Sequence, residues 1–273
     1  MIEAETLAVK ETRLRALLRS LESCVVAFSG GIDSALVLTV ATQELGERSW
    51  GITARSESLA EREYEGALAF AETIEAHHEV LETHELDDPA YAANPADRCY
   101  YCKRELYGRL AGLAREKGAR WIVDGFNLDD RNDWRPGRRA AAEFGVRSPL
   151  AEAGFTKRDV RALARHLDLE IWDKPALACL SSRFPYGTAI TLDLLRRVDL
   201  AEQAVHDAGI RVCRVRHHGE VARIEIPLEN LELALRPEVR AAVVAGVLAA
   251  GYRFVALDLG GYVSGNLNTK PHG

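Results

Sequence analysis

The chain has 273 residues, of which 47% are hydrophobic and 28% are charged, and both fractions are ordinary for a globular protein. Its formal net charge of −6 argues against duplex nucleic acid as a partner, because that partner needs a broad basic surface. No stretch approaches the roughly 20 apolar residues of a membrane-spanning helix, and the charged residues 1–23 do not have the apolar core of a signal peptide. With five cysteines and no secretion signal, we expect a protein of the reducing cytoplasm, where cysteines act more often as ligands or nucleophiles than as disulfides.

The first part of the chain alternates short apolar runs with helical patterns. The runs expected as strands are residues 24–29, 48–54, 77–83 and 119–127. The expected helices are residues 33–45, 59–74 and 104–118, followed by a helix and a short extended piece within 156–175. Strands that alternate with helices are joined by right-handed crossovers into a parallel sheet. The sequence therefore predicts an α/β domain whose ligands bind beyond the carboxyl ends of the strands.

The pattern changes near residue 186. A helix at 192–209 leads to two expected strands, 211–218 and 221–227, which a tight turn joins. A further helix at 236–251 precedes a last strand at 252–259. This order predicts a smaller α+β domain with an antiparallel sheet. We therefore expect two domains, at 1–185 and 186–273.

The sequence SGGIDS, residues 29–34, stands between an apolar strand and a helix. Glycines at such a place allow the main chain to approach a ligand closely, and N–H groups at a helix start attract anions. An ordinary strand–helix turn with a capping side chain would use the same residue types. The Lys and Ser/Thr of a Walker loop do not follow these glycines, so the segment is not a Walker loop.

This loop resembles that of the PP-loop ATP-pyrophosphatase superfamily, whose members cleave ATP to AMP and pyrophosphate. The resemblance implies that the loop holds the leaving pyrophosphate while a substrate oxygen takes AMP. The residues that it assigns to the phosphates are Ser29, Gly30, Gly31, Asp33 and Ser34, with Asp33 near Mg²⁺. It also implies that Ala54, at the end of the second strand, lines the adenine. Gly125, at the end of the fourth strand, is assigned to ATP as well, although a polar loop that caps the next helix has the same composition.

Cys99 and Cys102 lie three residues apart at an expected helix start. Residues at this spacing are neighbours on a helix surface, so the pair could form a redox disulfide, supply half a metal site, or pack. Cys24 and Cys213 each lie in an expected strand, where a free cysteine behaves as a small hydrophobe, and we expect both to be buried without a role in the chemistry.

Three stretches, residues 94–103, 124–161 and 172–187, together with 261–268, closely resemble the sulfur transferase family LarE of nickel-pincer nucleotide biosynthesis. The resemblance implies a substrate, pyridinium-3,5-biscarboxylic acid mononucleotide, whose carboxylate is adenylated by ATP and then converted to a thiocarboxylate. Cys179 matches the sulfur-handling cysteine of the family. In members with two further cysteines, all three bind a [4Fe-4S] cluster, so the resemblance assigns Cys99, Cys102 and Cys179 to a cluster. A zinc site, a disulfide relay with Cys179 and plain packing are the alternatives.

Several other charged residues are candidates for substrate binding. Lys174, Ser182 and Arg183 flank Cys179 in the sequence, where cations could bind a substrate phosphate and lower the pKa of the thiol. Arg214 and Arg216 alternate along an expected strand and therefore share one side of it, where they either bind the mononucleotide phosphate or form a solvated face. Glu202 and Glu225 match positions where the family keeps carboxylates for a metal.

We therefore expect an ATP- and Mg²⁺-dependent, AMP-forming sulfurtransferase with a [4Fe-4S] cluster. Its expected partners are a small-molecule nucleotide, an unidentified sulfur donor and, as the family resemblance implies, further copies of the chain, with no membrane and no nucleic acid. In one alternative, Cys179 gives up its own sulfur in a single turnover. The others are a tRNA thiolase, which the acidic charge disfavours, and a redox sensor that binds ATP and a cluster without catalysis.

Overall fold

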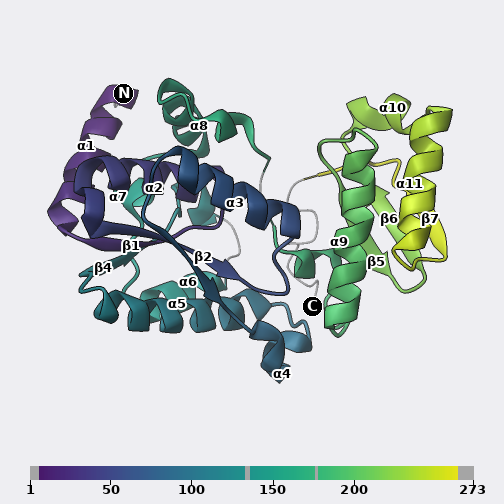
Figure 1. Ribbon diagram of the computed structural model, residues 1–273, viewed down its shortest axis with the longest axis horizontal. Coiled ribbons are helices and arrows are strands. Elements are labelled where there is room, and N and C mark those ends of the chain that lie inside the picture. The colour runs from purple at the N-terminus through teal and green to yellow at the C-terminus, as the bar shows by residue number, and fades with distance from the viewer. Residues whose placement is uncertain (1–5, 133–135, 176–177, 264–273) are drawn as a thin grey trace. The chain divides into compact units, whose positions relative to one another are not determined.

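The computed structural model describes residues 6–132, 136–175 and 178–263 (Figure 1). Two compact units make up the chain. The first contains Met1–Ser56, Glu63–Thr83 and Cys99–Leu177, and the second contains Glu57–Arg62, His84–Arg98 and Ala178–Gly273.

This division differs from the expected boundary near residue 186, because two short segments from the first part of the sequence belong to the second unit. Hydrogen bonds tie both segments to residues after 177. The N–H group of Leu180 donates to the carbonyl of Ser58 over 2.8 Å. The side-chain amide of Asn94, which is buried, donates to the carbonyl of Pro185 over 2.9 Å. Such contacts between distant residues cannot be read from local patterns.

The first unit contains a four-stranded sheet in the order β3-β2-β1-β4, with every pair parallel. Its strands are β1 (Cys24–Ala27), β2 (Ser49–Arg55), β3 (His78–Glu82) and β4 (Trp121–Val123). All four residues of β1 are buried, as a central parallel strand with helices on both faces requires. The predicted α/β class and its parallel sheet are therefore confirmed.

Helices pack on both faces of this sheet (Figure 1). One face carries α1 (Leu7–Leu21), α2 (Ile32–Leu45) and α8 (Lys157–His166), and the other carries α5 (Arg98–Glu116) and α6 (Gly137–Glu143). Side chains of β1 alternate between the two cores: Val26 packs in the first, whereas Val25 and Ala27 pack in the second. α3 (Glu61–Thr73) and α7 (Pro149–Glu152) also lie mainly in the first unit, whereas α4 (Pro89–Ala92) belongs to the second.

The second unit contains a three-stranded sheet in the order β5-β6-β7. Its elements are α9 (Leu192–Asp207), β5 (Arg214–His218), β6 (Val221–Glu225), α10 (Leu231–Leu235), α11 (Pro237–Ala249) and β7 (Phe254–Leu257). β5 and β6 are antiparallel, as predicted. β7 is parallel to β6, so the prediction of a wholly antiparallel sheet is wrong. The reason is that α10 and α11 lie between these strands in the chain and return it to the same end of the sheet.

Within the described residues, no helix is both long enough and apolar enough to cross a membrane.

The start of α8 is held by a capping box. The Thr156 hydroxyl accepts the N–H of Asp159, and the Asp159 carboxylate accepts the N–H of Thr156 over 2.9 Å. The same carboxylate forms a 2.6 Å ion pair with Lys10 of α1. We predict that Thr156→Ala lowers the free energy of unfolding by about 1 kcal/mol, because the N–H of Asp159 loses the hydroxyl that accepts it. Urea denaturation measures this change.

Thr73→Ala is the control, because the Thr73 hydroxyl is bonded to the carbonyl of Ala69 at an exposed helix position. Its effect should stay within about 0.5 kcal/mol. Equal losses in the two variants would contradict a special role for the capping box.

Candidate functional site

The loop after β1 leaves the start of α2 open to a ligand. Gly31 is the N-cap, and in the described structure no side chain caps this helix. Gly30 has φ +73°, and a Cβ placed on it would lie 3.0 Å from the Cβ of Ala67, so the loop needs glycine there. N–H groups at an uncapped helix start, next to an exposed Ser29, are suited to bind a phosphate.

Hydroxyl groups brace this loop from within. The hydroxyl of Ser34, which is buried, donates to the Gly31 carbonyl over 3.0 Å and accepts the N–H of Ser29 over 3.2 Å. The two serine hydroxyls are 3.1 Å apart. These bonds hold Ser29, Gly31 and Ser34 in one turn, so three of the residues predicted to bind phosphate lie together.

Asp33 lies at the start of α2, between a lysine and an amide. Lys157 of α8 forms an ion pair with one of its oxygens, and the Asn127 side chain donates to the other over 3.0 Å. Asn127 is buried, and its own oxygen accepts the N–H of Asp129. Asn127 and Lys157 therefore contact the loop 29–34 through Asp33, although both lie far from it in the sequence.

Gly125, after β4, lies directly against the start of α2. A Cβ on Gly125 would lie only 2.5 Å from the Ser34 nitrogen, so any larger residue would push the two segments apart. Ala54, in β2, is half-buried near the end of its strand. Ser34, Ala54 and Gly125 all follow or end parallel strands, so they lie toward the edge of the sheet where the ATP site is predicted.

Lys174 lies at the phosphate loop, which the sequence did not predict. Its ammonium group donates to the Gly30 carbonyl over 3.1 Å and pairs with Glu63 at 2.8 Å. Lys174 belongs to the first unit and Cys179 to the second, so a role of Lys174 beside Cys179 stays a prediction. Glu63 is a residue of this site that no motif indicated.

Cys99 and Cys102 lie in the first turn of α5, where Cys99 is exposed and Cys102 is half-buried. Lys103 follows them and passes beside Gly137. Burial lowers the pKa of Lys103, but electrostatic interactions with Tyr107, Cys102 and Asp124 outweigh this and hold the pKa above its usual value. The cysteine pair therefore has a permanent cation beside it in the first unit.

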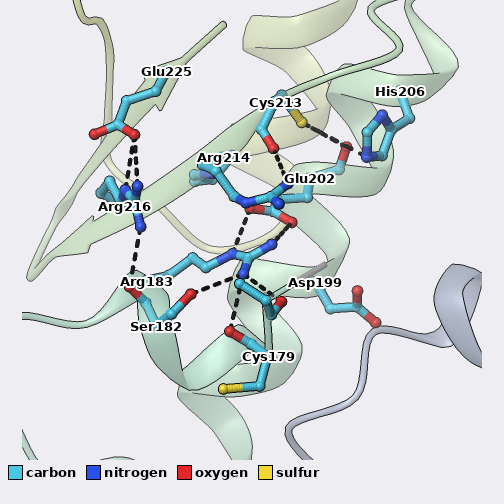
Figure 2. Close-up of polar contacts among 12 residues, drawn as sticks. Cys179, Ser182, Arg183, Asp199, Glu202, His206, Cys213, Arg214, Arg216 and Glu225 are labelled. Carbon is cyan, nitrogen blue, oxygen red and sulfur yellow. Dashed lines mark hydrogen bonds and ion pairs between the residues drawn. The ribbon is translucent and has the colours of Figure 1, made fainter. Parts of the chain in front are cut away.

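Cys179 precedes a short 3-10 turn, Leu180–Arg183, in the second unit (Figure 2). Cys179 is exposed. Arg183 points back beneath the turn, and its side chain is only 3% exposed in a pair with Glu202 of α9. Because every nitrogen of Arg183 has a partner within the protein, the prediction that this guanidinium binds substrate has no support in the described contacts.

Arg216 and Arg214 of β5 lie on either side of Val215 in the chain. The buried guanidinium of Arg216 pairs with Glu225 of β6 at 2.7 Å and donates to the Ser182 carbonyl over 3.0 Å. Arg214 donates to the carbonyl of Cys213 over 2.8 Å. Burial lowers the pKa of Arg214, and the charge of Arg183 lowers it further. Ser182 and three arginines are thus brought close together, as Figure 2 shows.

Glu202 and Glu225 are both buried and both paired with arginine. Glu225 accepts from Arg216 and also from Arg223, at 2.9 Å. Among the residues that the structure describes, no three His, Cys, Asp or Glu side chains gather as a metal site would need. The arrangement explains these two glutamates as counter-ions, and a metal at them stays a prediction.

The other two cysteines, Cys24 and Cys213, are buried, as predicted. Burial raises the pKa of Cys24 to about 12. Burial also raises the pKa of Cys213, whose sulfur lies 3.7 Å from the His206 ring nitrogen. Both groups therefore stay protonated at neutral pH, and a protonated, buried thiol is a poor nucleophile.

We predict that iodoacetamide at pH 8 modifies Cys99 and Cys179 of the folded, metal-free protein at least about tenfold faster than Cys24 and Cys213. The exposed thiols meet the reagent, whereas the buried ones stay protonated and covered. Peptide mass spectrometry after timed quenching measures each rate. All five cysteines should react at similar rates in 6–8 M urea, and early labelling of Cys24 in the folded protein would contradict its burial.

Comparison with known proteins agrees with this geometry. No protein-family model matches the chain. It is 41% identical over 264 residues to the pyridinium-3,5-bisthiocarboxylic acid mononucleotide synthase of Lactiplantibacillus plantarum, covering 96% of this chain and 95% of that protein. It is also 44% identical over 259 residues to an uncharacterized protein of Synechocystis sp., covering 95% of this chain and 97% of that one.

Among solved structures, the NMN synthetase of Francisella tularensis superposes with a TM-score of 0.50 and 19% identity, over 63% of this chain and 76% of that one. This likeness supports the fold alone, which is a parallel sheet with helices on both faces. The likeness to the Lactiplantibacillus synthase extends along nearly all of both sequences. The chain therefore belongs to the family of pyridinium-3,5-bisthiocarboxylic acid mononucleotide synthases, the LarE family that its motifs resemble.

Proposed function

We propose that this protein is an ATP-dependent sulfurtransferase that converts carboxylates of pyridinium-3,5-biscarboxylic acid mononucleotide to thiocarboxylates. The observation that carries the proposal is the open phosphate loop 29–34, with Asp33 at its helix start, in a chain whose full length matches a synthase of the bisthiocarboxylate product. The loop supports nucleotide chemistry, and the relative's name supports the identity of the substrate.

The first step of the proposed reaction activates the substrate. A carboxylate is a poor electrophile because its oxygen is a poor leaving group. Its oxygen therefore attacks the α-phosphorus of ATP, which gives an acyl-adenylate and releases pyrophosphate. Gly30, Gly31 and Ser34 would bind the departing pyrophosphate through N–H and hydroxyl groups. Asp33 would bind Mg²⁺, which requires its ion pair with Lys157 to rearrange, so that Lys157 becomes available to a phosphate.

The second step exchanges the leaving group for sulfur. A sulfide attacks the acyl carbon of the adenylate, AMP leaves with the bonding electrons, and a thiocarboxylate remains. Of the five cysteines, Cys99, Cys102 and Cys179 are not fully buried, and thiolates are the usual ligands of iron–sulfur clusters. We propose these three as the ligands of a [4Fe-4S] cluster. When bound, such a cluster supplies one iron without a protein ligand, a position that can carry a sulfide.

The exposure of Cys179 also favours a second route. Its thiolate would attack the acyl-adenylate to form a thioester and release AMP. Loss of the Cys179 α-proton and cleavage of its Cβ–S bond would then free the thiocarboxylate and leave dehydroalanine. This route needs no cluster and allows one turnover per chain. In both routes the partners are a small mononucleotide and ATP, and the cluster route also needs an external sulfur donor.

We predict that Asp33→Asn lowers the rate of pyrophosphate release at least about a hundredfold, because a neutral amide binds Mg²⁺ much more weakly than a carboxylate. Pyrophosphate release in the presence of substrate and ATP is the measurement. Asp207→Asn is the control, since Asp207 is exposed and accepts a hydrogen bond from Gln203 at the end of α9. Full activity of Asp33→Asn would overturn the assignment of the loop.

We also predict about four irons per chain after anaerobic reconstitution, which is the stoichiometry of a [4Fe-4S] cluster. Cys99→Ser, Cys102→Ser and Cys179→Ser should each lose the cluster, because three ligands leave none to spare. Cys213→Ser, which changes a buried thiol, should keep it. Iron analysis and the absorption spectrum measure both results.

The single-turnover route gives a different outcome. Only Cys179→Ser would then lose activity, and the mass of Cys179 in the wild-type protein would fall by the mass of H₂S after reaction. That result would reject the cluster and keep the sulfurtransferase proposal.

A further inference from the structure

The turn that carries Cys179 is held through its main chain by one arginine. A single terminal nitrogen of Arg183 donates to the carbonyl of Ala178 over 2.7 Å and to the carbonyl of Cys179 over 2.9 Å. It also lies 3.0 Å from the Ser182 hydroxyl. The guanidinium therefore bonds both peptide carbonyls that flank the Cys179 side chain. Figure 2 shows the sulfur on the side away from the guanidinium.

The guanidinium is itself fixed by a carboxylate. Its other two nitrogens bond the two oxygens of Glu202, at 2.9 and 2.8 Å, in a bidentate pair. One of these oxygens also accepts the N–H of Val215 over 2.8 Å, which anchors the pair to β5. Burial disfavours the charge of Glu202, but the Arg183 guanidinium outweighs this and holds the pKa of the carboxyl below its usual value. The pair is therefore ionised, and its planar geometry leaves little rotational freedom.

The remaining polar groups of the turn also bond to the second unit. The Leu180 N–H donates to the Ser58 carbonyl, the Ser181 hydroxyl is 2.6 Å from the Tyr91 hydroxyl, and the Ser182 carbonyl accepts from Arg216. Leu180 and Ser181 are buried, whereas Cys179 is exposed. The turn is therefore a rigid support with its reactive thiol directed outward.

Stability alone does not account for this construction. A buried arginine–carboxylate pair costs desolvation energy that its attraction barely repays, and apolar side chains of similar size often stabilise a core as well or better. The Arg183–Glu202 pair also fixes the peptide bonds on both sides of the exposed Cys179, which suggests a role in orienting the thiol. We propose that Arg183, oriented by Glu202, is a positioning residue that holds the Cys179 thiol where sulfur chemistry takes place.

This inference rests on the proposed function and deepens it, because it concerns the second step alone. Orientation of a reacting group raises the reaction rate, and a displacement of about 1 Å can lower that rate about a hundredfold. The loop 29–34 and its Asp33 belong to the other unit. Loss of Arg183 should therefore slow the sulfur step and leave adenylation unchanged.

The test replaces both partners at once, as Arg183→Met with Glu202→Gln. The pair disappears without an unpaired buried charge, and the glutamine oxygen can still accept the Val215 N–H. We expect pyrophosphate release in a single turnover to stay within twofold of wild type and thiocarboxylate formation to slow at least about tenfold. We also expect faster hydrogen exchange at the amides of Leu180 and Ser182, because both amides are hydrogen-bonded in the wild-type turn. A second variant, Arg183→Lys, keeps the charge without the planar fork and should show the same split to a smaller degree.

Arg223→Lys is the matched control. Arg223 pairs with the buried Glu225 and with Asp258 in the same unit, and neither pair involves the turn. It should leave both half-reactions and the exchange of the turn unchanged. An Arg183/Glu202 double variant with wild-type sulfur transfer, or with unchanged amide exchange, would overturn the inference.

Failure of the inference can be told apart from failure of the proposed function. If wild-type protein forms no thiocarboxylate, the proposed reaction is rejected, and Arg183 cannot be a positioning residue for it. If wild-type protein does form thiocarboxylate and the double variant forms it equally fast, only the inference fails. Equal losses of both half-reactions in the double variant and in Arg183→Lys would show a general structural role and would also overturn it.

Discussion

The contact between Gly125 and the start of α2 is the constraint on which the first unit depends. The space for a Cβ at Gly125 is already taken by the main chain of Ser34. This approach brings the end of β4 against the phosphate loop at the end of β1, and it leaves the N-cap of α2 to Gly31. Because no side chain caps the helix in the described structure, its N–H groups stay available to an anion. A stable fold and the proposed anion site would therefore come from the same packing.

The ion pairs at this loop are weak enough for their charged groups to change partners. Asp33 is held by Lys157, and the Gly30 carbonyl is held by Lys174, which also pairs with Glu63. These side chains are partly exposed, so each pair contributes little to stability. A phosphate offers lysine a stronger anion and a divalent cation offers Asp33 a stronger partner. The pairs thus keep the charges in place at low cost, as the proposed binding of a nucleotide requires.

In the second unit, by contrast, the ion pairs are buried and fixed. Arg183 with Glu202 and Arg216 with Glu225 are bidentate or multiply bonded and almost fully buried. Breaking such a pair leaves a buried charge, which is strongly destabilising. These residues are therefore suited to hold a turn rather than to follow a ligand. Burial also separates the cysteines. Burial raises the pKa values of Cys24 and Cys213, whereas Cys179 is exposed on its turn.

The sequence by itself determined the alternation of strands and helices, the loop 29–34, the burial of Cys24 and Cys213, and the family. These features depend on local periodicity, on glycine where the backbone needs it, and on motifs that stand together in the chain. A local pattern also indicated that the second unit is α+β. It could not show that β7 runs parallel to β6, because strand direction depends on the path of the intervening helices.

Only the tertiary structure decided which charged groups meet. Lys157 reaches Asp33 across 124 positions, and Lys174 reaches Gly30 across 144. Arg183 is adjacent to Ser182 in the sequence and looked like a substrate ligand, yet it turns inward to Glu202. The physical reason is that a long cationic side chain can face solvent or core from the same backbone position. Its direction is chosen by a counter-ion on a distant element, and no local pattern records that choice.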